Sequence, residues 1–347
     1  PWAMSSPCTS SRDLMPVSST CYRRQDSRQT NYRPPSALDR VAVYLLIPSR
    51  SIPFLLRLLV ATALLYGIVR WIAPPADLLA AAAAAEQRWL LLAAALTPIG
   101  LLLQWWKWRR LVRAGLPRIG ERDILSSLFA GFGLGLLTPG RLGELGRGAG
   151  WSGDRLRAMM LAGADRLVSS VVTLVAGVGC ALYTVPAAWV VWAILAVLAV
   201  GVSLRKFWGT ARLASLLSAL ADVSRAAWVS NIVAAIVFNM LFFVQMFCLL
   251  RATGPLSVDA VIAIPIMFAL KTLLPISLMD LGVREGAAIA VLGSVGVAAA
   301  TAVQASLMLF GLNVLAPGLA GLLVLFLNTR ATHLPTSTQR VEFAHVR

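Results

Sequence analysis

The residues in this chain that are best suited to chemistry are charged side chains set within apolar sequence. Arg141, Glu144 and Arg147 stand three residues apart in the stretch LLTPGRLGELGR. On a helix this spacing places the three side chains on one face, where the carboxylate can pair with the guanidinium groups. A guanidinium group matches a phosphate through two parallel hydrogen bonds. The stretch therefore predicts a polar site for an anionic group.

A second set of charges lies in the stretch ALKTLLPISLMDLGVREG, where a proline again separates an apolar part from a charged part. Asp280 and Arg284 stand four residues apart in it, and this spacing predicts that they pair. Asp165 and Arg166 stand inside a long apolar run. The predicted substrate-binding residues are Arg141, Glu144, Arg147, Asp165, Arg166, Lys271, Asp280, Arg284 and Glu285.

The composition indicates that these charges lie within a membrane. Of the 347 residues, 58% are hydrophobic and 13% are charged, whereas a soluble domain is nearer a quarter charged. A charged side chain at the bilayer centre costs about 2.5–3.5 kcal/mol on insertion scales. Broken backbone and charge are tolerated at that depth only where they line a cavity or face protein. The charged residues are therefore predicted to line a polar cavity.

The apolar runs predict an all-α, polytopic membrane protein with about 6–8 membrane segments, each near the ~20 residues that cross a bilayer. The polar segments 1–50 and 330–347 are expected to be disordered tails around a membrane domain at 51–329. A basic loop that includes Lys107 is expected at 107–122. Spanning helices are expected at 52–72, 89–106, 156–185, 187–204 and 229–250, followed by apolar segments at 287–296 and 298–326.

Two short apolar pieces, 124–138 and 261–274, are each closed by a proline, and each leads to a charged turn and a new helix. Short segments broken by glycine and proline at matching positions of two halves are typical of a transport site near the bilayer midplane. We therefore predict two re-entrant elements in an inverted-repeat arrangement. The spacings of Gly131 to Gly135 and Gly146 to Gly150 are interpreted as helix packing.

The net charge of +16 is interpreted as membrane topology and attraction to anionic lipids, rather than as nucleic-acid binding. Arginines concentrate in both tails and in the segments 107–122 and 205–225. This distribution predicts that both termini are cytoplasmic, in a bacterial-type inner membrane. Arg155 and Arg157 are interpreted as topology signals at the cytoplasmic start of a helix.

The sequence does not offer the residues of a metal or nucleotide site. The two histidines, His333 and His345, both stand near the C-terminal end, and the four cysteines form no CxxC pair. The chain contains neither a P-loop nor a DxD cluster. We therefore expect no metal, no cofactor and no ATP-driven step within this chain.

The motifs LTPGRLGELGR, ADRLVSS and LLPISLMDLGVREGAAIAVLGSVGV resemble the two signatures of the lysylphosphatidylglycerol synthase transmembrane-region family, over about residues 52–328. The resemblance implies a flippase-like domain that moves or presents lipids with charged or glycosylated headgroups. Bifunctional relatives add a soluble aminoacyl-transferase domain, which we expect this chain to lack. The residues at signature positions are Arg141, Glu144, Arg147, Asp165, Arg166, Arg284 and Glu285.

Together these patterns predict a protein that binds a phosphate-bearing lipid, aminoacylated or glycosylated, and translocates it across the inner membrane. Arg141, Arg147 and Arg284 are expected to contact the phosphate, while the acidic residues hold those arginines or bind a cationic headgroup or proton. Two alternatives stay open: a membrane-embedded glycosyl or phosphoryl transferase that uses lipid-linked donors, and a non-transporting scaffold for lipid-synthesis enzymes. The lipid, the direction, the energy source and the oligomeric state stay undetermined.

Overall fold

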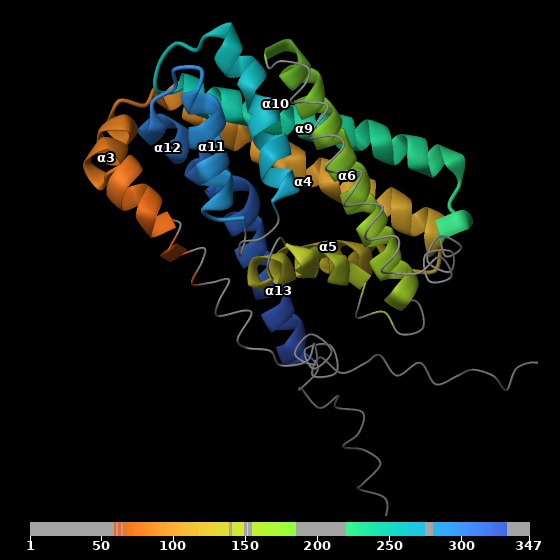
Figure 1. Cartoon of the computed structure of the whole chain (residues 1–347). Helices are drawn as coiled ribbons and strands as arrows, with labels where there is room; N and C mark the ends of the chain where they lie inside the picture. The colour runs from red at the N-terminus through yellow and green to blue at the C-terminus, as the bar shows by residue number, and fades with distance from the viewer. Residues whose placement is uncertain are drawn as a thin grey trace, which may run out of the picture. The chain divides into compact units, whose positions relative to one another are not determined.

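The structure is a computed structural model, and it describes residues 59, 62–63, 65–138, 141–148, 151, 155–184, 220–274 and 280–331 (Figure 1). All of these belong to one compact unit, Pro35–Arg347. The predicted tail 1–50, nearly all of the predicted tail 330–347 and the predicted span 187–204 lie outside the described residues. So do Pro139 and Pro275, which end the two predicted re-entrant pieces.

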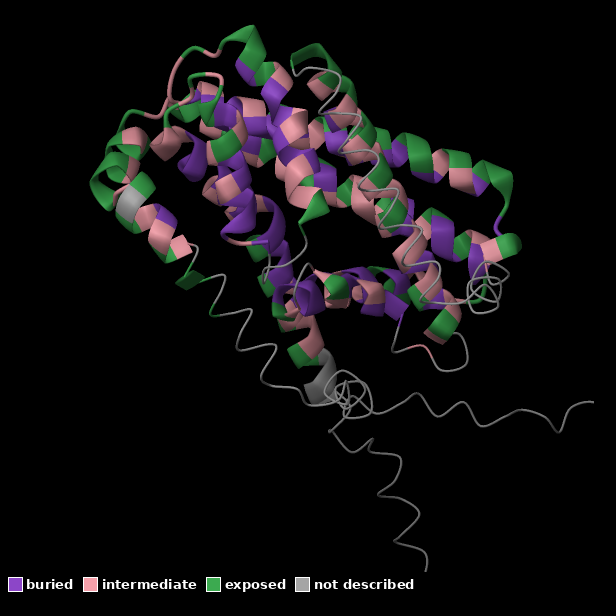
Figure 2. Cartoon of the chain, in the orientation of Figure 1, coloured by how far each residue is buried: buried purple, intermediate pink, exposed green. Residues whose placement is uncertain are grey.

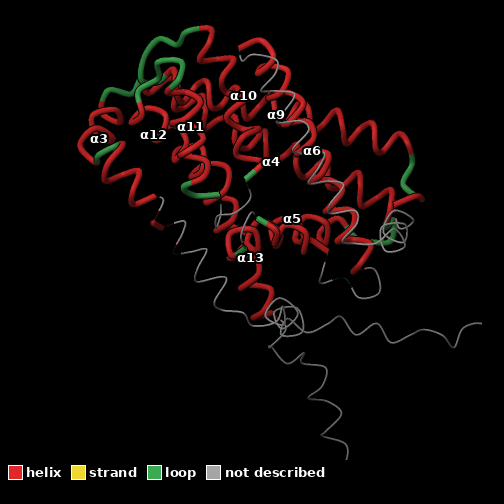
Figure 3. Tube along the Cα trace, viewed as in Figure 1, coloured by secondary structure: helices red, strands yellow, loops and turns green. Residues whose placement is uncertain are grey.

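The described residues form helices and loops with no strand, as Figure 3 shows. The all-α prediction is therefore confirmed for this part of the chain. In chain order the elements are η1 (Ile68–Ile72), α3 (Pro75–Ala83), α4 (Gln87–Gly115), α5 (Glu121–Leu137), η2 (Leu142–Gly148), α6 (Arg155–Thr184), α9 (Arg225–Arg251), α10 (Val258–Leu273), α11 (Val283–Gly293), α12 (Ala299–Phe310), η3 (Gly311–Leu315) and α13 (Ala316–Ala331).

Four described helices are long and apolar enough to cross a membrane: Gln87–Gly115, Arg155–Thr184, Arg225–Arg251 and Ala299–Leu327. Their outer faces are apolar and exposed, as the green faces in Figure 2 show. On α9, for example, exposed valines recur every fourth residue along one face. Such a stripe is unfavourable in water and suits contact with lipid tails. The chain is thus a polytopic helical membrane protein, as predicted.

The helices α4 and α9 form a long antiparallel pair. The amide of Gln245 donates to the Ala93 carbonyl at 3.0 Å, and at the other end Trp108 packs in one apolar cluster with Ala227. The two contacts pair early residues of one helix with late residues of the other, which defines the antiparallel direction. This pair forms the seam between the two halves of the described fold.

The two halves repeat the same order of elements around this seam. In the first half η2 packs against α5 and α6, and in the second half α11 packs against α10 and α12. The short helices exchange partners: α5 packs along α13, and α10 packs along α6 (Figure 1). Arg141 (φ 57°) and Asp280 (φ 63°) are the described non-glycine residues in the left-handed region, and each stands just before the short helix of its half. The two halves thus share this local order of elements, while the re-entrant, inverted arrangement of the two broken elements stays a prediction.

Close backbone approach holds the first short helix against α13. A Cβ on Gly321 would lie 2.0 Å from the carbonyl oxygen of Phe129, and a Cβ on Gly133 would lie 2.8 Å from the Leu322 amide. A side chain at either position would force the helices apart. Such small-residue contacts replace the hydrophobic driving force that water would supply, because lipid tails are as apolar as the helix surfaces.

The connection between α4 and α5 is held by charge outside the spanning segments. The guanidinium groups of Arg113 and Arg109 bind the Glu121 carboxylate at 2.7 Å and 2.8 Å. These hydrogen bonds lower the pKa of Glu121 below its ordinary value. The carboxylate therefore stays ionised at neutral pH and keeps the start of α5 beside the end of α4.

Candidate functional site

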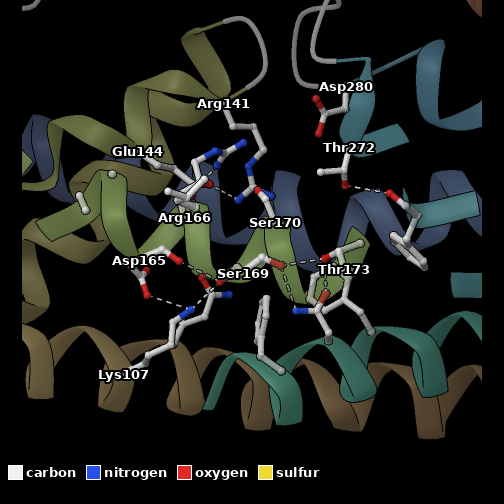
Figure 4. A pocket seen from close by; sticks show the side chains of 18 of the residues that line it. Lys107, Arg141, Glu144, Asp165, Arg166, Ser169, Ser170, Thr173, Thr272 and Asp280 are labelled. Carbon is white, nitrogen blue, oxygen red and sulfur yellow. Dashed lines mark hydrogen bonds and ion pairs between the residues drawn. The ribbon is translucent and has the colours of Figure 1, made fainter. Parts of the chain in front are cut away.

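A cavity of about 440 Å³ lies between α4, α6, α9 and α10 and the segments that follow the two short helices α5 and α10 (Figure 4). Seven of the nine predicted substrate-binding residues line it. Arg284 and Glu285 are not among the described residues that line it. The charged lining residues are Lys107, Arg141, Glu144, Arg147, Asp165, Arg166, Lys271 and Asp280.

Glu144 is the common partner of three arginines. Arg141 pairs with one of its carboxylate oxygens, while Arg147 (3.3 Å) and Arg166 (3.1 Å) bind the other. The predicted pairing of the three residues around η2 is therefore present. Figure 4 shows Arg141 and Arg166 reaching toward each other beside Glu144. Glu144 thus gathers three guanidinium groups at one end of the cavity.

Asp165 joins helices from both halves. Its carboxylate lies 2.9 Å from the Lys107 ammonium and 3.2 Å from an Arg147 nitrogen. It also accepts a hydrogen bond from the Asn231 amide at 3.2 Å. Asp165 is 4% exposed, so the ion pairs replace the water that a carboxylate would otherwise bind. The contact ties α4, η2 and α9 to α6.

The prediction that Lys107 lies in a basic loop is wrong. The helix α4 continues to Gly115, nine residues beyond the predicted end of the span, and Lys107 is 4% exposed within it. Its ammonium donates to the Ser169 hydroxyl at 2.8 Å in addition to pairing with Asp165. Because α4 is longer than predicted and the buried carboxylate of Asp165 lies opposite it, Lys107 lines the cavity and does not belong to a loop.

The uncharged polar wall of the cavity was not predicted. On α6, Ser169 and Thr173 stand four and eight residues after Asp165 and line the cavity on the same helix face. The Thr173 hydroxyl donates to the Asn239 side-chain oxygen at 2.6 Å. The four-residue spacing from a buried acid was a usable signal for Ser169 and Thr173. Asn239 had no such signal, because it comes from a different helix.

The second half contributes a separate ion pair to the cavity. The Lys271 ammonium lies 3.0 Å from the Asp280 carboxylate. The predicted pair of Asp280 with Arg284 is wrong, because Asp280 is in the left-handed region and precedes the start of α11. The two residues therefore do not share a helical face. Arg284 pairs with Glu285 at 2.7 Å instead.

Glu285 is the centre of a buried cluster beside the cavity lining. It is 0% exposed and accepts hydrogen bonds from the Gly282 amide (2.7 Å) and the Ser306 hydroxyl (2.9 Å). Arg284 lies over the Phe310 ring, 5.0 Å from its centroid. The Gly282 contact caps the N-terminus of α11, where a carboxylate is favoured. This cluster fixes α11 against α12.

Glycines of α5 make room for the charged side chains of η2. A Cβ on Gly131 would lie 2.5 Å from Arg147 Cγ, and a Cβ on Gly135 would lie 3.1 Å from Glu144 Cγ. Gly131 and Gly135 were interpreted as helix-packing residues. In the structure they face the side chains of Arg147 and Glu144, so the glycine face of α5 also positions these two charged residues.

We expect Gly131→Ala to weaken binding of an anionic lipid about tenfold, the scale of one charge-assisted hydrogen bond. The new methyl group displaces Arg147, which holds the carboxylate of Glu144. Alanine is favoured over glycine within a helix by about 1 kcal/mol, so the loss does not come from helix propensity. The measurement is lipid binding by the purified protein. Gly179→Ala is the matched control, because a Cβ there meets nothing within 4 Å. Equal binding by both variants would contradict the positioning role.

The charges of the cavity do not balance. Five cationic and three acidic side chains of the described residues line it, an excess of two positive charges among them. The buried Nε atoms of Arg141 and Arg147 have no hydrogen-bond acceptor among the described residues. Uncompensated donors in an apolar bundle are costly unless a ligand or water accepts their hydrogen bonds. The arrangement is therefore suited to an anionic ligand.

Comparison with known proteins identifies a family. The sequence profile of the family described as "Lysylphosphatidylglycerol synthase TM region" matches residues 54–321. No curated protein and no solved structure matches the chain. The matched region includes every charged residue that lines the cavity.

Proposed function

The chain belongs to the lysylphosphatidylglycerol synthase transmembrane-region family, and from this membership we propose that it binds a phosphate-bearing lipid headgroup and moves it across the bilayer. The observation that carries the proposal is that cations outnumber acids by two among the described residues that line a cavity within an apolar helical bundle. Guanidinium groups bind phosphate strongly through paired, charge-assisted hydrogen bonds.

Arg141 and Arg166 are the proposed phosphate contacts. Both line the cavity, and their side chains are 16% and 33% exposed. Arg147 is 6% exposed and is held between Glu144 and Asp165, so we assign it to positioning. Arg166 takes the phosphate-binding role that the sequence suggested for Arg284. Glu144 holds the two contact arginines side by side until the headgroup arrives.

We propose that the two halves are inverted relative to each other, and this arrangement suggests how the headgroup moves. The short helices α5 and α10 each pack against a long helix of the other half. Rocking of one half against the other would open the cavity first to one leaflet and then to the opposite one, as in other transporters built from inverted repeats. Aromatic side chains on the α9 and α10 side of the cavity suit the apolar part of the lipid.

The distribution of arginines supports a proposal for which side of the membrane each end of the helical bundle faces. The Arg-rich connection between α4 and α5 contacts anionic headgroups best on the cytoplasmic side of a bacterial-type inner membrane. We propose that both termini share that side. Accessibility of single cysteines introduced at Arg118 and Gly254, tested with a membrane-impermeant reagent, should differ, with the Arg118 position protected in intact cells. Gly254 follows α9 at the opposite end of the bundle.

Headgroup translocation is measured with the purified protein in vesicles that contain a labelled anionic phospholipid. We expect Arg141→Gln to slow translocation by about 10–100-fold, because it removes charge-assisted hydrogen bonds worth about 1.5–3 kcal/mol. The matched control is Arg157→Gln, whose guanidinium pairs with Asp222 away from the cavity lining. Full activity of folded Arg141→Gln protein would contradict the phosphate contact.

The same vesicles test the two alternatives. Formation of a new lipid product by the wild-type protein alone would replace the transport proposal by a transferase. A wild-type protein that moves no lipid but co-purifies with lipid-synthesis enzymes would replace it by a scaffold.

A further inference from the structure

We propose that Trp108 and Phe132 are positioning residues of the headgroup site, because their rings hold the guanidinium group of Arg147 in place. Neither is among the described residues that line the cavity. We call these two rings the aromatic slot. The inference rests on the proposed function and adds two residues that act on the headgroup through Arg147.

Arg147 joins two groups of charged side chains. One of its terminal nitrogens lies 3.3 Å from the Glu144 carboxylate, and the other lies 3.2 Å from the Asp165 carboxylate. Glu144 also binds the two proposed phosphate contacts, and Asp165 also binds Lys107. Figure 4 shows Glu144 beside Arg166, and Asp165 beside Lys107. A shift of Arg147 would therefore disturb both groups.

The aromatic slot stabilises the charge of Arg147 at one place. The guanidinium carbon lies over both rings, 5.5 Å from the Trp108 centroid and 5.8 Å from the Phe132 centroid. Trp108 is 0% exposed, and Phe132 and Arg147 are also buried. A cation is attracted to the face of an aromatic ring, and the attraction is strongest where water is excluded. An aliphatic side chain in place of either ring would fill space without this attraction.

Contacts with α5 and with a neighbouring indole fix the Trp108 ring. Its Nε1 donates a hydrogen bond to the Ser127 hydroxyl at 2.9 Å, and that hydroxyl donates to the Ile124 carbonyl at 2.8 Å. The ring also stacks on Trp151, with 6.3 Å between centroids and 14° between planes. A buried indole whose N–H is bonded has a defined orientation. The face offered to Arg147 is therefore set by the protein itself.

The helix α5 supplies both a ring and the room beside it. Gly131 precedes Phe132, and a Cβ on Gly131 would lie 2.5 Å from Cγ and 3.2 Å from Nε of Arg147. The side chain of Arg147 thus passes directly over the backbone of α5 before it reaches the aromatic slot. The glycine and the two rings together restrict where the guanidinium group can lie.

The first test compares the same substitution at two positions of α5. The probe is dioleoyl phosphatidylglycerol, bound to the full chain in detergent and measured by native mass spectrometry. Phe132→Leu removes a ring over which Arg147 lies and should weaken binding about tenfold, within the range of one desolvated cation–π contact. Phe129→Leu removes a ring that meets Phe132 edge to face, and its affinity should stay within about twofold of wild type. Equal affinities of the two folded variants would overturn the role of the Phe132 ring.

The second test asks whether position 108 needs a ring or only volume. Trp108→Phe keeps an aromatic face and should bind the lipid within about threefold of wild type, whereas Trp108→Leu should bind about tenfold more weakly. Ser127→Ala keeps the indole and removes the hydrogen bond that orients it, so it also informs if Trp108→Leu does not fold. We expect about threefold weaker binding from it. Equal binding by Trp108→Phe and Trp108→Leu, or wild-type binding by Ser127→Ala, would contradict the positioning role of Trp108.

A double-mutant cycle separates positioning from a purely structural role. In Arg147→Gln protein the guanidinium group is absent, so adding Trp108→Leu should weaken lipid binding by less than about a further twofold. A ring that only fills the core would weaken binding by the same factor with or without Arg147. Such additivity would overturn the inference.

The failures of the two proposals are distinguishable in the same assay. If Arg141→Gln weakens binding of dioleoyl phosphatidylglycerol while Phe132→Leu and Trp108→Leu leave it unchanged, the proposed function stands and the aromatic slot is refuted. If binding of this lipid does not depend on Arg141, the proposed function fails, whatever the ring variants do.

Discussion

Asp165→Asn should destabilise the folded protein by about 3–5 kcal/mol, the range expected when one partner of a buried ion pair is removed. The substitution keeps the shape of the side chain and removes its charge. Lys107, 2.9 Å away, and Arg147, 3.2 Å away, would then remain buried beside a neutral amide. Lys107 then loses its carboxylate partner, and Arg147 keeps Glu144 as its remaining one.

Thermal unfolding of the purified protein in detergent measures this loss, and we expect the midpoint to fall by roughly 10 °C. The double variant Lys107→Gln with Asp165→Asn removes a cation as well as the anion. It should regain about half of the lost stability, because the buried ammonium without a counter-ion is gone and the two amides can bond to each other. A double variant less stable than Asp165→Asn alone would show that the lysine does not depend on the carboxylate.

Asp165 was predictable from the sequence, and the reason is energetic. A charge within a long apolar run is costly unless something in the fold compensates for it, so the run itself marks the residue. The same reasoning identified Arg141, Glu144 and Arg147, where proline and glycine also indicated a broken helix. The local sequence was sufficient at these positions because the charged residues and the apolar, proline- and glycine-containing sequence that makes them unusual are adjacent in the chain.

Lys107 shows where local pattern fails. It stands between tryptophans and arginines that look like an aromatic belt followed by a cytoplasmic loop, and nothing near it distinguishes it from Arg109. The difference arises from Asp165 on α6 and from the packing of α9 along α4. These contacts join segments far apart in the sequence. Composition and periodicity carry no information about them.

Backbone conformation explains the error at Asp280. Spacing of four residues predicts a contact only if both residues stand on one helix. Asp280 takes up a left-handed conformation before α11 begins, and it turns toward Lys271 of α10. A non-glycine residue in that region is uncommon and is enriched at functional sites. The sequence pattern for such a position is weak, since asparagine and glycine are the usual signals.

Glu285→Gln is the second substitution for which we expect a large effect, a loss of about 3–5 kcal/mol of stability. Glu285 is 0% exposed, and its carboxylate binds Arg284, the Ser306 hydroxyl and the Gly282 amide. The amide that replaces it keeps one acceptor oxygen and leaves Arg284 buried without its counter-ion. The N-terminal cap of α11 is weakened at the same time.

The accompanying binding result separates structure from function. Glu285 is not among the described residues that line the cavity, so the fraction of Glu285→Gln protein that stays folded should bind the anionic phospholipid within about twofold of wild type, a change below about 0.5 kcal/mol. Arg141→Gln should give the opposite pattern, with weaker binding and a nearly unchanged unfolding midpoint. Ser306→Ala removes a hydroxyl that donates to the Glu285 carboxylate and accepts from the Arg284 guanidinium, and it should lose less, about 1.5–3 kcal/mol, because both charged groups keep each other. If Glu285→Gln instead abolishes binding while the protein remains as stable as wild type, then the second broken element touches the headgroup directly and the boundary of the site must be moved to include α11.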